Sequence, residues 1–154
     1  MQNRALGVCE RPAEPQGSMH MPQSSAQLES AAQPIAVLLV EDDYLVAESA
    51  AVMLEELGHV ATSALSAAKA LELVRGGAHF DLVITDFAMP GMNGLLLAEE
   101  LRRIDPDLPI LLMTGFADTS GRGSGGLPRL EKPFTIEKLA LQVDSLARRS
   151  ARRA

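Results

Sequence analysis

Residues 81–94 read DLVITDFAMPGMNG, and this stretch decides the fold. Its first six residues place Leu, Val, Ile and Thr between two aspartates, which predicts a short buried strand that ends in a carboxylate, Asp86. Pro90 and Gly94 indicate a turn, because proline and glycine favour turn geometry. A leucine-rich helix is then expected over about 95–104, where the following prolines would end it. The stretch therefore predicts a strand, a turn and a helix.

The chain before this stretch shows the same alternation of strand and helix. Residues 35–40 read IAVLLV, which is typical of a parallel strand buried on both faces, and an acidic triplet follows at 41–43. Apolar residues then recur at helical spacing, and Gly58 stands where a helix would end. A second strand is expected at 60–65, and Ser66 can cap the helix after it.

The chain after this stretch continues the alternation with one interruption. Residues 110–114 (ILLMT) predict a fourth strand. The segment 115–128 holds five glycines and little apolar periodicity, so a loop or a poorly formed helix is expected there. A short strand near Leu130 runs into Lys132, and an amphipathic helix is expected over about 136–149.

Five strands, each followed by a helix or its remnant, predict a doubly wound α/β fold with helices on both faces of a parallel sheet. In such sheets the ligand site lies beyond the carboxyl ends of the strands. We expect the reactive side chains at these ends to meet at one edge of the sheet. They are Asp42, Asp43, Asp86, Thr114 and Lys132.

This set of side chains suits phosphoryl transfer to a carboxylate. Carboxylates held close together repel one another unless a hard cation such as Mg²⁺ binds to their oxygens. A carboxylate beside such a cation can attack a phosphoryl group and form an aspartyl phosphate. A lysine and a hydroxyl, here Lys132 and Thr114, can bind the phosphoryl oxygens. For Asp43 a helix-capping role is the favoured interpretation.

Four motifs at these strand ends resemble the receiver family of two-component response regulators. They are VEDD (40–43), ITDFAMPGMNG (84–94), MTG (113–115) and EKPF (131–134). The resemblance covers roughly residues 35–149. It implies a five-stranded, flavodoxin-like parallel sheet in the order 2-1-3-4-5, in agreement with the strands predicted above.

The resemblance implies a role for each residue of the site. Asp86 is the expected phosphoryl acceptor, Thr114 the switch hydroxyl and Lys132 the phosphate-binding lysine. The expected Mg²⁺ ligands are Asp42, Asp86, Glu41 through water, and the backbone carbonyl of Ala88. The implied partner is a sensor histidine kinase or a histidine phosphotransfer protein. The chain is not expected to be an enzyme beyond Mg²⁺-dependent self-phosphorylation and slow self-dephosphorylation.

The sequence departs from the family pattern in two places. Arg129 stands three positions before Lys132, where receivers usually carry an aromatic residue that takes part in switching. The segment between Thr114 and Lys132 is short and rich in glycine, so the fourth helix is expected to be degenerate.

The resemblance also places Ala88 and Phe116 beside the expected path of hydrolytic water. Neither side chain can orient or deprotonate water, which predicts slow loss of the phosphoryl group.

Composition and charge narrow the function further. The single cysteine, Cys9, excludes an internal disulfide, and no aliphatic run is long enough to cross a membrane, so a cytoplasmic protein is expected. The formal net charge of −6 makes nucleic-acid binding unlikely as a main function. Residues 1–33 are expected to form a disordered leader, 34–149 the receiver domain and 150–154 a basic tail.

Three functions are open on the sequence alone. The favoured one is a phosphorylation-dependent signalling module that acts on an unknown output protein, because no output domain is recognisable after residue 149. The second is a phosphate sink that has no output. The third is an adaptor that contacts DNA weakly through the arginines near the carboxyl terminus.

Overall fold

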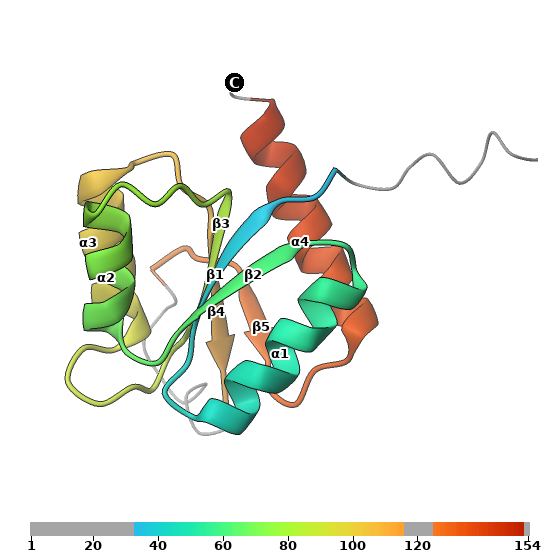
Figure 1. The fold of residues 1–154 in the computed structure, drawn as a ribbon, viewed down its shortest axis with the longest axis horizontal. Coiled ribbons are helices and arrows are strands. Elements are labelled where there is room, and N and C mark those ends of the chain that lie inside the picture. Colours follow the sequence, from blue (N-terminus) through green and yellow to red (C-terminus); the bar gives the residue numbers. More distant parts are fainter. Residues whose placement is uncertain (1–32, 116–124, 153–154) are drawn as a thin grey trace, which may run out of the picture. The chain divides into compact units, whose positions relative to one another are not determined.

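A computed structural model of the chain describes residues 33–115 and 125–152. Within them, five strands form one sheet in the order β2-β1-β3-β4-β5, and each neighbouring pair is parallel (Figure 1). The predicted fold class and strand order are confirmed. The strands are β1 (Ala36–Val40), β2 (Val60–Ala64), β3 (Leu82–Asp86), β4 (Ile110–Thr114) and β5 (Arg129–Glu131).

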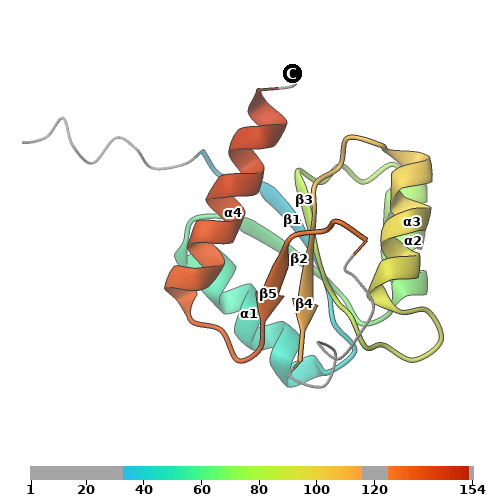
Figure 2. The same cartoon turned by 180° about the vertical axis from the view of Figure 1, so that it is seen from behind.

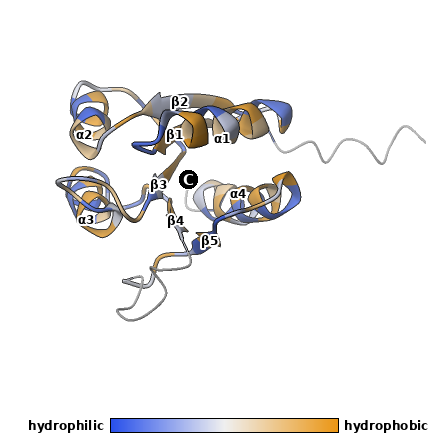
Figure 3. Ribbon diagram, turned by 90° about the horizontal axis from the view of Figure 1, so that it is seen from below, coloured by the Kyte–Doolittle hydropathy of each residue, from blue (hydrophilic) through white to orange (hydrophobic). Residues whose placement is uncertain are grey.

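Four helices cover the two faces of this sheet. Helices α1 and α4 lie on one face, and α2 and α3 lie on the other (Figures 2 and 3). Their bounds are α1 (Tyr44–Glu56), α2 (Ala67–Arg75), α3 (Gly94–Ile104) and α4 (Ile136–Ala151).

Strand β1 shows why the central strands must be continuous aliphatic runs. Its side chains alternate between the faces: Leu38 and Val40 belong to the core under α2 and α3, while Val37 and Leu39 belong to the core under α1 and α4. All four are fully buried. Because both faces are covered by helices, no position in the middle of the sheet faces solvent, and a polar side chain there would have to find a partner.

The helices begin at the capping residues expected from their chemistry. The side chain of Asp43 accepts hydrogen bonds from the backbone N–H groups of Leu45 and Val46, which confirms its capping role. Ser66 caps α2 in the same way. At the far end of α1, Gly58 adopts a φ of 85°, a left-handed conformation that glycine enters without a steric penalty.

Three expectations, two about the chain ends and one about the loop, can be compared with the structure only in part. Helix α4 continues to Ala151, two residues beyond the predicted end, so the expected tail at 150–154 begins inside the helix. The predicted leader at 1–33 falls almost entirely on residues outside the described part of the chain. The predicted degenerate helix falls largely on residues 116–124, which are outside it as well.

Among the described residues, every helix is too short or too polar to span a membrane.

Candidate functional site

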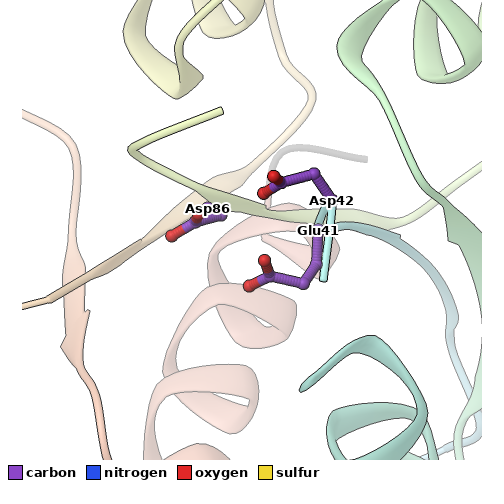
Figure 4. A group of neighbouring side chains, drawn as sticks. All are labelled: Glu41, Asp42 and Asp86. Atoms are coloured by element: carbon purple, nitrogen blue, oxygen red, sulfur yellow. The ribbon is translucent and has the colours of Figure 1, made fainter. Parts of the chain in front are cut away.

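The carboxyl ends of β1 and β3 bring three carboxylates together. Glu41 and Asp42 directly follow β1, and Asp86 is the last residue of the adjacent strand β3. One carboxylate oxygen from each residue lies within 4.8 Å of the other two. Figure 4 shows Glu41 and Asp42 extending from the end of β1 on the side of Asp86. The strand ends alone predicted that Asp42 and Asp86 would meet here, whereas Glu41 was expected only from the family resemblance.

Lys132 joins the group from the far end of the chain. Its Nζ donates to Glu41 Oε2 at 2.6 Å and lies 2.9 Å from Asp86 Oδ1. The main chain holds this lysine in place, because its N–H donates to the carbonyl oxygen of Thr114 at 2.8 Å. A single ammonium therefore bridges two carboxylates that come from different strands.

The pKa values of Glu41 and Lys132 are both raised, by burial for the carboxyl and by hydrogen bonding for the ammonium. Glu41 is only 2% exposed, and this burial raises the pKa of its carboxyl above the ordinary 4.5 although hydrogen bonds from Lys132 and the Asp43 N–H oppose the rise. Burial alone would lower the pKa of Lys132, but its hydrogen bonds to Glu41 and Asp86 outweigh burial and raise it above 10.5. Lys132 is thus firmly held as an ammonium ion.

Thr114 ends β4, next to the acceptor strand. It is 1% exposed, and its Oγ1 has no hydrogen-bond partner in the part of the chain that the structure describes. A buried hydroxyl without a partner is costly, by about 1–3 kcal/mol. Thr114 is therefore able to gain a hydrogen bond when an acceptor atom arrives near the strand ends.

Ala88, Phe116 and Arg129 are the other residues that the sequence singled out, and no hydrogen bond or ion pair joins Ala88 or Arg129 to the carboxylates among the described residues. Ala88 lies two residues beyond Asp86 in the connection to α3, and its side chain is exposed. The metal-binding role of its carbonyl stays a prediction. Phe116 lies outside the described residues. Arg129 is the first residue of β5, partly buried, and its Nε is buried without a hydrogen-bond partner among the described residues.

Two residues around the acceptor were not singled out as functional from the sequence. Thr85 is fully buried beside Asp86, and its hydroxyl donates to the Asp86 carbonyl oxygen at 3.1 Å. Gly94 was interpreted as a turn former, but a Cβ atom there would lie 2.3 Å from that same oxygen. Thr85 could not be recognised from the sequence, because threonine is common in strands whether or not its hydroxyl has a role. For Gly94, the glycine itself could have indicated a close approach of another backbone at the start of the helix.

The donor atoms of this site fit a hard divalent cation. Three carboxylates and one ammonium leave two negative charges uncompensated when all are ionised, and carboxylate oxygens are the ligands that Mg²⁺ prefers. Glu41, Asp42 and Asp86 are the residues that would hold such an ion. The chemistry of the donor set thus agrees with the predicted magnesium site.

Comparison with known proteins agrees with this geometry. Residues 37–144 match the family described as response regulator receiver domain. The chain belongs to this family. The receiver protein CpdR of Brucella abortus is 34% identical to it over 114 residues, which cover 71% of this chain and 94% of CpdR.

Longer relatives and solved structures also match this chain over its receiver domain. It is 35% identical to the two-component response regulator PhoP of Pseudomonas aeruginosa over 119 residues, which cover 75% of this chain and 52% of PhoP. The chain thus spans about half the length of the first curated relatives that it matches. A receiver protein structure from Sinorhizobium medicae is 30% identical, with a TM-score of 0.68 over 77% of this chain and 98% of that one.

Proposed function

We propose that this receiver domain accepts a phosphoryl group on Asp86 from a sensor histidine kinase or a histidine phosphotransfer protein. The reaction depends on Mg²⁺, and the phosphorylated domain acts on an output protein through direct contacts. One observation carries the proposal: Lys132 Nζ lies 2.9 Å from a carboxylate oxygen of Asp86, beside two further carboxylates, at the edge of the sheet where ligands bind.

Each residue of the site would have a separate role in the phosphoryl transfer. An oxygen of Asp86 attacks the phosphorus of the donor phosphohistidine, an O–P bond forms, the N–P bond breaks, and the released imidazole nitrogen takes a proton from solvent. Lys132 is already next to Asp86 and would pair with a phosphoryl oxygen. The buried Thr114 hydroxyl would donate to another oxygen. Bound Mg²⁺ supplies positive charge that offsets the charge of the phosphoryl oxygens.

An apolar hollow beside the site supports a protein as the phosphoryl donor. It has a volume of about 430 Å³, and Leu45, Met53 and Phe134 line it together with Lys132. Leu45 is 76% exposed although it is a large hydrophobic residue, so contact with a partner would remove apolar surface from water. A docked partner would therefore lie directly beside the phosphoacceptor.

The proposed role is that of a signalling module and not of an enzyme with an external substrate. The only reaction expected after transfer is slow hydrolysis of its own acyl phosphate. The methyl side chain of Ala88, two residues beyond Asp86, cannot orient or deprotonate an attacking water.

A small phosphodonor tests the proposal without knowledge of the kinase. Incubation with acetyl phosphate and Mg²⁺ should add one phosphoryl group to the intact protein, measured by mass spectrometry. Asp86→Asn should abolish the addition, and EDTA should suppress it in the wild type. Asp43→Asn is the matched control, because asparagine caps a helix as well as aspartate does. Undiminished labelling of Asp86→Asn would refute the assignment.

A further inference from the structure

The carbonyl oxygen of the acceptor residue is held from two sides. On one side the Thr85 hydroxyl donates to the Asp86 oxygen at 3.1 Å. Thr85 is completely buried in the middle of the sheet. Valine would fill the same space and bury more apolar surface, so packing alone does not explain a hydroxyl at this position.

On the other side, the first residue of α3 packs directly against the same carbonyl. A Cβ atom on Gly94 would lie 2.3 Å from the Asp86 oxygen and 2.8 Å from Leu112 Cδ1. The φ of Gly94 is not in the left-handed region, so its backbone conformation does not require glycine. The requirement is steric, and it comes from the acceptor residue itself.

The connection after the acceptor is closed by main-chain hydrogen bonds. The Phe87 N–H donates to the Met113 carbonyl at 2.8 Å, and the Gly94 N–H donates to the Phe87 carbonyl at 2.9 Å. The loop that contains Ala88 is therefore tied at both ends. Its starting direction depends on the orientation of the peptide unit that begins at the Asp86 carbonyl.

We propose that Thr85 and Gly94 are positioning residues for the phosphoacceptor. The Thr85 hydroxyl holds the Asp86 carbonyl, and the absence of a Cβ at Gly94 leaves room for it. Together they set the backbone torsion ψ of Asp86, which with φ limits the side-chain rotamers that are allowed. The same torsion sets the path of the chain toward Ala88. This proposal rests on the proposed function of Asp86, and it adds that the correct placement of its carboxylate depends on a hydroxyl and a missing side chain that do not contact the phosphoryl group.

Two substitutions of Thr85 separate positioning from packing. Thr85→Val keeps the volume and removes the donor, and Thr85→Ser keeps the donor and removes a methyl group. We expect Thr85→Val to retain the Tm of the wild type but to phosphorylate about three- to tenfold more slowly, the range expected for one lost hydrogen bond. Its affinity for Mg²⁺, measured by isothermal titration calorimetry, should fall as well. Thr85→Ser should show the opposite: a lower Tm with wild-type phosphorylation and Mg²⁺ affinity.

Gly94→Ala tests the steric half of the proposal. Displacement of the Asp86 carbonyl by an added Cβ should slow phosphorylation about 100-fold, as misplacement of a reacting group by about 1 Å can do. Gly76→Ala is the control, because the added Cβ there also approaches a backbone oxygen, at 3.1 Å, but at the C-cap of α2 and not at the strand ends that form the site. A folded Gly94→Ala that is phosphorylated at the wild-type rate would overturn the steric half of the proposal. If Gly94→Ala does not fold, the Thr85 pair still tests the hydroxyl half.

The outcomes distinguish this inference from the proposed function. Wild-type rate and Mg²⁺ affinity in Thr85→Val would overturn the positioning role of Thr85, as would equal impairment of both Thr85 variants. If the wild-type protein takes no phosphoryl group from acetyl phosphate, the proposed function fails. The comparison of Mg²⁺ affinities between Thr85→Val and Thr85→Ser still tests positioning in that case.

Discussion

Replacing Lys132 with methionine should leave two buried carboxylates facing each other without their cation. Nζ lies 2.6 Å from a Glu41 oxygen and 2.9 Å from an Asp86 oxygen, so each attraction is roughly 6 kcal/mol at an effective dielectric constant of about 20. Part of this loss is offset, because the variant no longer has to remove an ammonium ion from water on folding. Breaking a buried pair from one side costs about 3–5 kcal/mol net. Because the Lys132 side chain is 24% exposed, we expect the lower end, about 3 kcal/mol.

Urea unfolding without divalent cations, followed by circular dichroism, measures this loss. With an m-value of about 2 kcal/mol/M, the midpoint should fall by about 1.5 M. Lys69→Met is the matched control. Lys69 pairs with Glu72 at a similar distance, 2.8 Å, but on the surface, where such a pair contributes about 0–1 kcal/mol.

The pH dependence of the loss identifies its cause. Burial already raises the pKa of Glu41, and removal of Lys132 removes an influence that lowers it. An acid with a raised pKa in the folded state destabilises the protein above its unfolded pKa, and protonation relieves this. The deficit of Lys132→Met should therefore shrink as the pH falls from about 7.5 toward 4.5. A deficit that is equal at both pH values, or no greater than that of Lys69→Met, would refute this reasoning.

Five further predictions concern single residues. The wild type should lose stability as the pH rises above 10.5 and through the raised pKa of Lys132, because the stability that its ion pairs contribute is complete only below the ordinary pKa; Lys132→Met should lack this step in alkaline unfolding curves. Asp43→Ala should lower the free energy of unfolding by about 1 kcal/mol through loss of a cap yet largely retain Mg²⁺ affinity. Asp42→Ala should weaken Mg²⁺ binding by at least about tenfold in calorimetry. Gly58→Ala should cost about 1 kcal/mol in urea unfolding, because its φ is 85° and nothing lies within 4 Å of the added Cβ. Ala88→Asn should shorten the lifetime of the phosphorylated protein, followed by mass spectrometry, and an unchanged lifetime would show that this position does not control hydrolysis.

The fold could be predicted because each strand carries its own local signal. Uninterrupted aliphatic runs such as 35–40 indicate strands buried on both faces, and alternating elements require parallel crossovers. Once the sheet is parallel, Asp42, Asp86 and Lys132 must come to the same edge. The capping roles of Asp43 and Ser66 were also predictable, because an N-cap bond forms within one turn of the helix.

The contacts that refine the site were not predictable from local patterns. Thr85 looks like any β-branched strand residue, and its hydrogen bond depends on where the adjacent carbonyl turns at the strand end. The close approach of Gly94 to Asp86 depends on how α3 packs on the sheet. The family resemblance assigned Lys132 to the phosphoryl group and Glu41 to the metal, and nothing in the sequence indicated that these two side chains form a hydrogen bond with each other.

The bond between Lys132 and Glu41 joins residues 91 positions apart in the chain. Contacts of such long sequence separation form late in folding, because a long loop must close before the contact contributes any stability. A chain that ends before β5 lacks this lysine, and it also lacks the side chains of α4 that pack under β1 and β3. If the proposed transfer to Asp86 requires Lys132, partly synthesised or proteolysed copies that lack β5 would accept no phosphoryl group and would not compete with intact copies for the donor.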